Sequence, residues 1–356
     1  MLSIDFYESG KGETIILTFP DGSLGVVDAH PSPSSSRPAI EELVRGKVVE
    51  FVCLTHPHQD HGADLVNVLS AAKSVNQFWH SVSDIQTLVY SYTEQKKFPD
   101  IHSDLIEDLR KKWANFLLNL YSNIATRLAE DPSFISKKTS SSRSEEIQGV
   151  QISFLSPEES ELNRYFSKLK GIIEGKKLRK PNENHLSIVI QLDYGKSSLL
   201  LGADAEKRNW TAAIKNSSKW QLPRNRLLKV PHHGASNSLS TIKKRSYLKS
   251  LCDKQDLFSI LFAGDSKHPN PSVFEALKNQ STLLCLRNGL KNADDTDRNP
   301  LNIDLEGAEA YGEGSICNPV ISFEVWDDGR IVLKEGEQCD HCNAQTSSSD
   351  ITNTNN

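Results

Sequence analysis

Short apolar runs separated by turn-forming residues fill the first part of the chain, and this pattern predicts a β-sheet. One turn, Pro20-Asp21-Gly22, joins two of the predicted strands with residue types that favour tight reversals. The run VVEFVCL at 48–54 is mostly β-branched or apolar, so it predicts a buried strand. The elements expected in this part are strands at 2–9, 13–19, 24–28 and 48–54 and a helix at 38–46.

Further along, the spacing of the apolar positions changes. They recur at three- and four-residue steps through 84–135, which predicts mainly helices. A polar stretch rich in serine and lysine at 137–146 predicts a loop. The remaining expected elements are a strand at 149–155, partial helix at 157–181, two strands within 186–202, and alternating strands and helices to about 334.

This pattern predicts one domain and a tail. The domain spans 1–335 and contains a helical insert at about 84–147. The residues at 336–356 are largely Ser, Thr, Asn and other polar types, a composition that cannot bury enough apolar surface to fold, so we expect a disordered tail.

Composition narrows the class of protein. The 356 residues are 37% hydrophobic and 24% charged, which is ordinary for a globular domain. The net charge of −5 argues against a broad basic surface that coats nucleic acid, although it leaves room for a local basic groove. No apolar run approaches the roughly 20 residues of a membrane span, and the N-terminus lacks the features of a signal peptide. We therefore expect no membrane association and a cytoplasmic location.

The six cysteines do not form a disulfide framework, because they are scattered along the chain. Cys339 and Cys342 have the spacing of half a zinc ribbon, but no second pair lies nearby. We interpret this pair as a coincidence near the end of the chain.

The densest chemical motif is THPHQDHG at 55–62, directly after a predicted strand. His56, His58, Asp60 and His61 put three imidazoles and a carboxylate within six residues. These are ligand types for a divalent cation such as Zn²⁺ or Mn²⁺. In a turn, the first two histidines can reach one ion, while Asp60 and His61 reach a second ion.

Further candidate ligands also follow predicted strands. Asp204 ends an apolar run at 198–204 and could bridge two ions, although an aspartate after a strand often only caps a helix. His232 and His233 follow another apolar run, and we expect one to bind metal and the other to face the substrate. His268 precedes a predicted helix, where it is either a catalytic residue or part of a plain helix-entry loop.

These motifs resemble those of the metallo-β-lactamase superfamily. The 55–62 turn looks like its signature, and Gly25-Val26-Val27-Asp28 resembles its first aspartate motif, with His30 in place of the usual glycine. The order of the later motifs is similar to the hydrolase domain of ComEC-type DNA-uptake proteins, and the resemblance covers about 1–80 and 148–334. Those motifs are Asn184 with Ser187, Gly202-x-Asp204, Lys229 with His232-His233-Gly234, and His268-Pro269.

The resemblance implies a fold, a cofactor and a mechanism. The fold would be α+β, a four-layer αββα sandwich, and the cofactor two divalent ions, Zn or Mn. Hydrolysis would use a metal-bridging hydroxide, with Asp60 orienting this nucleophile. Similar phosphorylcholine esterases imply that His233 binds metal and His232 contacts the substrate. The third ligand of the first ion is Asn184 or His185, and both stay open.

The substrate that the resemblance implies is a phosphodiester such as DNA. Basic residues that could hold a phosphate backbone precede both the Asn184 motif and the His-His pair, and a solvated helix face is the plain alternative. They are Lys168, Lys170, Lys176, Lys177, Arg179, Lys180, Arg224, Arg226 and Lys229.

Two other functions remain open on the sequence alone. One is hydrolysis of a small phosphodiester, such as a cyclic nucleotide or a phosphocholine ester, with the insert as a lid. The other is a non-catalytic partner in a multi-protein system, against which the full ligand set argues. In either case the insert at 84–147 is where we expect a protein partner to dock.

Overall fold

The computed structural model describes residues 1–10, 12–31, 38–93, 104–141, 143–239, 247–253, 256–262, 268–286 and 320–336. Within these ranges the strands form two sheets. The first runs in the order β15 (Ile331–Glu335), β14 (Val320–Val325), β1 (Leu2–Tyr7), β2 (Thr14–Thr18), β3 (Leu24–Val27), β4 (Val48–Leu54), β5 (Ser74–His80) and β6 (Ile135–Lys138). The second runs β13 (Thr282–Leu286), β12 (Phe258–Phe262), β11 (Leu227–Lys229), β10 (Ser197–Leu201), β9 (Val189–Tyr194), β8 (Val150–Ser156) and β7 (Ser144–Ile147).

Both sheets are mixed. In the first sheet β1, β2 and β3 pair antiparallel, whereas β3, β4, β5 and β6 are parallel. In the second, β7 to β10 pair antiparallel and β10 to β13 are parallel. The parallel strands β4, β10 and β11 matter most for function, because the loops that follow them carry the candidate ligands.

The main core lies between the two sheets. β1 alternates strictly between buried and half-buried residues, so Ile4 and Phe6 face inward. They meet large apolar side chains of both sheets, among them Phe51 and Phe154. Phe51 also stacks on Trp79, with ring centroids 3.8 Å apart. Burial of this apolar surface is the dominant force that holds the sheets face to face.

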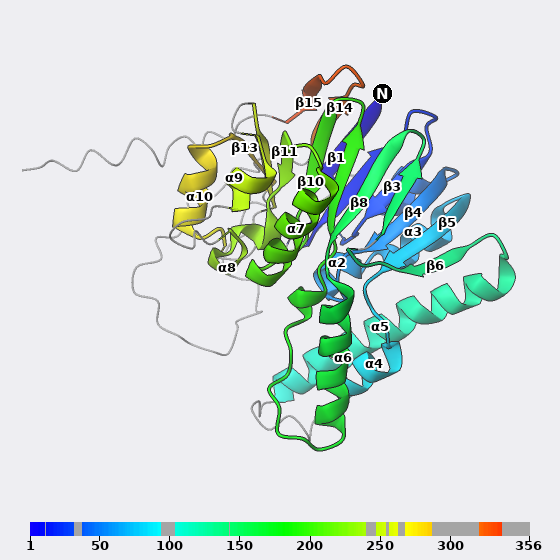
Figure 1. The fold of residues 1–356 in the computed structure, drawn as a ribbon. Coiled ribbons are helices and arrows are strands. Elements are labelled where there is room, and N and C mark those ends of the chain that lie inside the picture. Colours follow the sequence, from blue (N-terminus) through cyan, green and yellow to red (C-terminus); the bar gives the residue numbers. More distant parts are fainter. Residues whose placement is uncertain are drawn as a thin grey trace, which may run out of the picture.

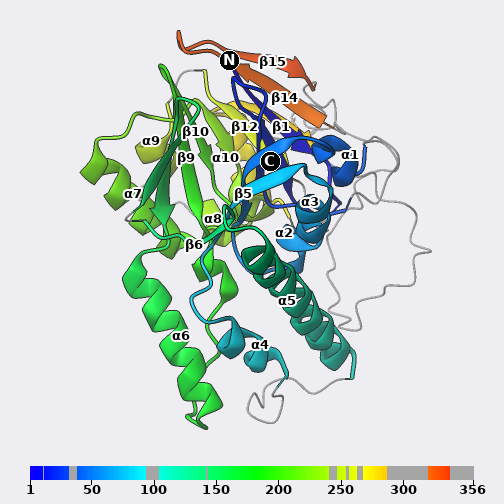
Figure 2. The same cartoon turned by 90° about the vertical axis from the view of Figure 1, so that its right-hand side faces the viewer.

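Helices cover the outer face of each sheet (Figures 1 and 2). Apolar residues of α1 (Ile40–Val44), α3 (Leu65–Ala71) and α5 (Asp104–Glu130) pack on the first sheet. Those of α7 (Lys207–Trp220), α9 (Tyr247–Leu251) and α10 (Pro271–Lys278) pack on the second. Two sheets face to face with helices outside make the α+β, four-layer αββα sandwich that the motifs implied, so this prediction is confirmed.

Within the described residues, the helices of the predicted insert are α4 (Ile85–Thr93) and α5, which pack with α6 (Glu159–Ile173) below the sandwich (Figure 2). The loop predicted at 137–146 was partly wrong, because β6 and β7 occupy much of it. Each is an edge strand of four residues, in opposite sheets, and Lys137 of β6 pairs with Glu145 of β7 at 3.0 Å. Edge strands face solvent, so a polar sequence without apolar alternation still forms them.

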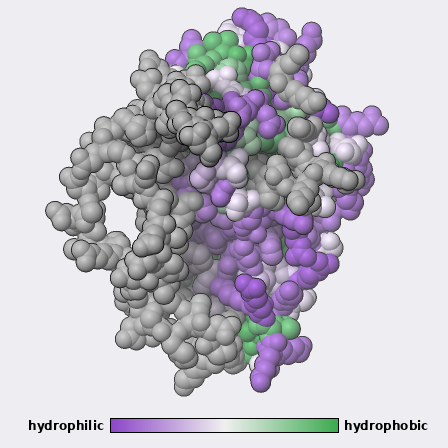
Figure 3. Space-filling view, turned by 90° about the vertical axis from the view of Figure 1, so that its left-hand side faces the viewer, coloured by the Kyte–Doolittle hydropathy of each residue, from purple (hydrophilic) through white to green (hydrophobic). Residues whose placement is uncertain are grey.

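Figure 3 shows a described surface that is mainly hydrophilic, with a few apolar patches. Among the described residues, no helix combines the length and the apolar character that crossing a bilayer requires. The tail from 337 onward lies outside the described residues, as do Cys339 and Cys342.

Candidate metal centre

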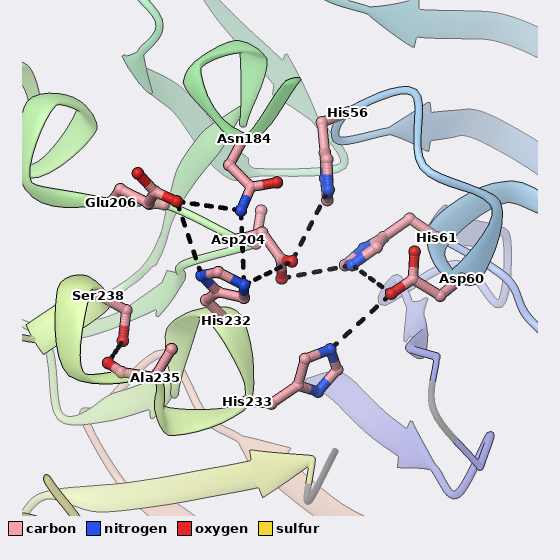
Figure 4. A network of polar contacts seen from close by, with 12 residues as sticks. His56, Asp60, His61, Asn184, Asp204, Glu206, His232, His233, Ala235 and Ser238 are labelled. Atoms are coloured by element: carbon pink, nitrogen blue, oxygen red, sulfur yellow. Dashed lines mark hydrogen bonds and ion pairs between the residues drawn. The ribbon is translucent and has the colours of Figure 1, made fainter. Parts of the chain in front are cut away.

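The candidate ligands converge at one end of the sandwich from several strand ends (Figure 4). The segment after β4 leads through His56 and His58 into the short helix α2 (Gln59–Gly62), which carries Asp60 and His61. Asp204 follows β10, and the turn η3 (Pro231–Gly234) after β11 carries the two later histidines. Separate strand ends thus bring distant motifs together.

Two groups of potential ligand atoms lie here, each with all its atoms within 4.8 Å of one another. We call His56, His58 and Asp204 the first metal group. The second metal group consists of Glu13, His61, Asp204 and His233. Asp204 belongs to both groups: its Oδ2 lies 3.8 Å from His56 Nε2, and its Oδ1 lies 3.3 Å from His61 Nε2. One carboxylate shared by two groups is the arrangement that a bridging ligand requires.

Buried polar atoms without partners show that these groups fit cations. Within the described residues, His56 Nε2, His61 Nε2 and Asp204 Oδ1 are buried and lack a hydrogen bond. Both carboxylate oxygens of Glu13 are also buried without a hydrogen bond, although Oε1 forms an ion pair with Lys229. Leaving such atoms unpaired costs about 1–3 kcal/mol each, and more for charged groups, so their clustering calls for a partner. Imidazole nitrogens and carboxylate oxygens together suit Zn²⁺ or Mn²⁺.

Hydrogen bonds fix the ring of His61, which follows β4 of the first sheet and faces Asp204, after β10 of the second sheet. Asp28 Oδ2 lies 2.7 Å from His61 Nδ1, and the same carboxylate accepts hydrogen bonds from Thr55 N at 2.8 Å and Thr55 Oγ1 at 2.7 Å. A carboxylate on Nδ1 leaves Nε2 directed toward Asp204. Such partners orient metal-binding histidines and raise their basicity. Asp28 therefore buttresses the centre by orienting His61 and the segment at Thr55.

The charges of the cluster are strongly coupled. Burial is the largest influence on His56 and lowers the pKa of its imidazole well below the usual value. Burial also disfavours a charged His61, but nearby carboxylates, foremost Asp204, hold the pKa of its ring well above the usual value. Conversely, although burial opposes its ionisation, the imidazoles of His61 and His56 lower the pKa of Asp204 well below its usual range. Asp204 is accordingly an anion that requires positive charge beside it.

The backbone around these residues is strained. Ala203, His232 and His233 have φ angles of 45°, 48° and 50°, in the left-handed region that residues other than glycine seldom adopt. Such conformations cost of order 1–3 kcal/mol each and persist where the surrounding structure imposes them. Here all three strained residues lie in the segments after β10 and β11 that carry the candidate ligands.

The two adjacent histidines occupy different positions. His233 belongs to the second metal group, and its Nδ1 lies 3.1 Å from the carbonyl oxygen of Phe262. His232 belongs to neither group, although its Nε2 lies 3.8 Å from Asp204 Oδ2. The His268 ring lies next to that of His232, with the ring centroids 5.7 Å apart.

Asp60 is at the open side of the centre. Its side chain is 34% exposed, and its Oδ2 lies 4.0 Å from both His61 Nε2 and His233 Nε2. It thus adjoins the second metal group while remaining accessible to water.

The structure separates Asn184 from His185, both in the turn η2 (Glu183–Leu186). Asn184 is at the centre: its Oδ1 is buried without a hydrogen bond, and its Nδ2 lies 3.4 Å from His232 Nε2. His185 instead faces Glu206, with its Nε2 3.9 Å from Glu206 Oε2, and belongs to neither group. The position of His185 does not fit a metal ligand, because its ring faces Glu206 and belongs to neither metal group.

Glu13 was missed from the sequence because it belongs to no recognisable motif. The one sequence feature that points to a close approach of the chain here is the pair Gly10 and Gly12, just before β2. A Cβ atom on Gly12 would lie 2.3 Å from the carbonyl oxygen of Asp60, so only glycine allows the loop to approach the centre this closely. Glu13 N then donates to Asp60 O at 3.1 Å.

Lys229 lies beneath the centre and not at its surface. Its side chain is fully buried, pairs with Glu13, and donates to the carbonyl oxygen of Ala203 at 2.9 Å. The expected contact between Lys229 and a substrate does not fit this position, because both its neighbours and its burial keep it from the open side.

Lys176 and Lys177 also differ from expectation. They are exposed and follow the far end of α6, a helix of 15 residues. This helix is about 22 Å long at 1.5 Å per residue. Lys176 pairs with Glu174 at 3.2 Å, so part of its charge is already balanced. These lysines do not line the metal centre.

Similarity to known proteins is limited to the fold. No protein-family model matches the chain, and no curated protein matches it. Solved structures to which the chain is similar include a diphosphatase from the PhnP family (TM-score 0.39, 11% identity, 80% of this chain and 94% of that one). Another is Zn²⁺-bound PqqB from Methylobacterium extorquens (TM-score 0.39, 7% identity, 82% and 99%).

A third such structure is an E377D mutant of CmlA β-hydroxylase (TM-score 0.40, 12% identity), where the match covers 75% of this chain. The chain spans about half of that protein, 46% of its length. The similar structures include metallo-β-lactamase-fold proteins, among them YhfI from Bacillus subtilis (TM-score 0.33, 12% identity, 64% and 70%). The resemblance to ComEC-type domains stays a prediction from the motifs.

The two adjacent histidines should respond differently to replacement. His233→Ala is expected to lose the ion of the second metal group, because it removes one of that group's ligands. His232→Ala should keep both ions but lower kcat about a hundredfold, as expected for loss of a proton-transfer group. Metal content by mass spectrometry, measured beside the rate of ester hydrolysis, checks both. Metal loss in His232→Ala with retention in His233→Ala would reverse the assignment.

Proposed function

We propose that this chain is a metal-dependent phosphodiesterase acting on small phosphodiesters. The observation that carries the proposal is the pair of metal groups that share Asp204, each with buried ligand atoms that lack partners. Two divalent cations held in this way supply Lewis acidity to a phosphoryl oxygen and water activation at neutral pH. The motif resemblance to phosphodiester hydrolases supports the same reaction.

The residues around the groups fit distinct tasks. Asp60 is partly exposed beside the second metal group, where it can orient a water molecule and accept its proton. His232 lies on the other side of Asp204, and its Nδ1 is 4.0 Å from Glu206 Oε1. Glu206 thereby helps to orient the His232 ring, which can exchange a proton with the departing oxygen. Asn184 Nδ2 lies within 3.4 Å of His232 Nε2 and 3.2 Å of Glu206 Oε1, where it can hold a phosphoryl oxygen.

A hollow next to the centre supports a small substrate. Glu206 and His185 form part of its wall, its volume is about 560 Å³, and the other walls come from α6, α7 and α8 (Ser236–Leu239). This volume is typical of small-molecule sites. Arg208 and Lys215 line it but pair with Glu161 and Glu158, both at 2.8 Å, so these cations are already compensated. A polyanionic strand would gain little from them.

The location of the basic segment after α6 favours the same conclusion over a nuclease. Lys176 and Lys177 follow the far end of α6 and do not line the metal centre. A substrate confined to the centre and the hollow does not reach them.

The function is tested by supplying metal-loaded protein with several substrates. These are bis-p-nitrophenyl phosphate, p-nitrophenyl phosphorylcholine, a cyclic nucleotide, single-stranded DNA and plasmid. We expect Mn²⁺- or Zn²⁺-dependent turnover of the small diesters. Absence of turnover of every substrate by protein that binds two ions would refute the proposal and favour the non-catalytic role.

Neutralising the basic segment separates the two substrate classes. The triple variant Lys176→Gln, Lys177→Gln, Arg179→Gln is expected to hydrolyse small diesters within twofold of the parent. If DNA were the substrate, each lost phosphate contact would also reduce the salt dependence of its binding by about one unit of slope. A selective fall in DNA cleavage of tenfold or more would overturn the small-substrate assignment and favour a nuclease.

A further inference from the structure

One candidate ligand lacks the support that the others have. His56, His61 and His233 each have a polar atom within hydrogen-bond distance of Nδ1, at 3.3, 2.7 and 3.1 Å. For His58, no side chain or backbone group of the described residues hydrogen-bonds to the ring. Metal-binding histidines are almost always oriented by such a partner. Something else must therefore hold the His58 ring.

The ring of Trp113 lies against His58. The ring centroids are 4.8 Å apart and the planes are tilted by 42°. Trp113 is half-buried and comes from α5, which belongs to the helical insert. One turn further along α5, the Phe116 ring covers Gly62 so closely that a Cβ atom there would lie 2.6 Å from it. The insert thus packs directly on the ligand-bearing turn α2.

Trp113 is itself held by a polar network. The Tyr92 ring of α4 meets it at a centroid distance of 5.3 Å and an angle of 73°. The Tyr92 hydroxyl donates to Glu183 Oε1 at 2.8 Å. Lys180 Nζ pairs with the same oxygen at 2.8 Å and lies 4.0 Å above the Tyr92 ring. This network fixes the aromatic face that His58 contacts.

Glu183 connects this network to the other side of the first metal group. It is buried and immediately precedes Asn184, whose Oδ1 is the unpaired oxygen at the centre. A continuous set of contacts therefore runs from His58 through Trp113 and Tyr92 to the segment that carries Asn184. In Figure 2, α4, α5 and α6 lie together on this side of the sandwich, next to α2.

We propose that the helical insert positions one ligand of the first metal group, with Trp113 as the positioning residue for His58. Packing against a large, rigid aromatic ring restricts rotation of the imidazole, as a hydrogen bond on Nδ1 does for the other histidines. The histidine rings of the second metal group are oriented instead by Asp28 and by a backbone carbonyl. The proposal rests on the metal centre of the proposed function but not on its substrate.

The test is titration of metal-free protein with Mn²⁺ or Zn²⁺, followed by calorimetry. Trp113→Ala is expected to weaken binding of one ion by about 10- to 100-fold and to leave the other unchanged. Trp113→Phe should bind both ions within threefold of the parent, because an aromatic face remains. Leu118→Ala is the matched control: Leu118 is 50% exposed on the same helix, and its replacement should change neither affinity.

A second background identifies which ion is affected. His233→Ala retains the first metal group, so adding Trp113→Ala should then weaken the one remaining ion by the same factor. Equal weakening of both ions in Trp113→Ala, or parent-like binding of both, would overturn the proposal. A Trp113→Phe variant as weak as Trp113→Ala would also overturn it. By contrast, a parent that binds two ions but hydrolyses no ester would refute the proposed function alone.

Discussion

Asp204→Asn is expected to abolish hydrolysis and to lower metal content from about two ions per chain. Asp204 is the one residue shared by both metal groups, and its buried carboxylate supplies the negative charge between them. An amide of the same size cannot supply that charge. A loss of about 4 kcal/mol of transition-state stabilisation corresponds to roughly a thousandfold in kcat/KM. Metal analysis and steady-state kinetics measure the two effects.

Asp193→Asn is the matched control for this experiment. Asp193 lies on β9 of the same sheet, partly buried, and accepts hydrogen bonds from Ser198 and Gln191 away from the centre. This variant should keep both ions and the parent rate. Full activity of Asp204→Asn would show that the two groups do not share a ligand.

Lys229→Met is expected to destabilise the metal-free protein by about 3 kcal/mol. Lys229 and Glu13 form a fully buried ion pair, and removing one partner leaves an uncompensated buried carboxylate. Burial already raises the pKa of Glu13, with Lys229 acting against this effect. The substitution also removes the hydrogen bond to Ala203 O. Urea unfolding with a chelator present measures the free energy of unfolding.

The double variant Glu13→Gln, Lys229→Met shows whether the pair itself is responsible. Because the stranded charge is gone, its stability should return to within about 1 kcal/mol of the parent. Lys196→Met, at an exposed position, should change stability by less than about 0.5 kcal/mol. A double variant that is less stable than Lys229→Met would mean that Glu13 stabilises the fold independently of Lys229.

The resemblance of the motifs implied the sandwich, and several strands within it have strong local signals of their own. The alternating pattern of β1 and the apolar run of β4 depend only on burial, and both strands lie where their patterns placed them. The edge strands β6 and β7 escaped notice because solvent exposure removes the constraint that produces alternation. These two strands form because they pair with a neighbouring strand, and a local sequence pattern does not reveal such tertiary contacts.

The same distinction between local sequence signals and tertiary contacts explains which residues of the candidate centre could be predicted. Motifs with several ligand types in one turn, such as His56 to His61, are visible in sequence because chemistry and proximity coincide. Glu13 and Trp113 reach the centre only through the fold. For Lys229 the sequence predicted a substrate contact that the fold does not allow. A basic residue near a histidine pair suggests a contact at the surface, but Lys229 ends a buried strand and is enclosed by its neighbours.

The short strands β6 and β7 also bear on how copies of this protein meet one another. Unpaired backbone groups at a sheet edge are templates for strand addition by a second chain, which leads to aggregation. β6 reads ISKK and β7 reads SEEI, so each of these edges is four residues long and charged. The ion pair between Lys137 and Glu145 ties the two edges to each other. This side of the sandwich is thereby a poor template for intermolecular β-pairing.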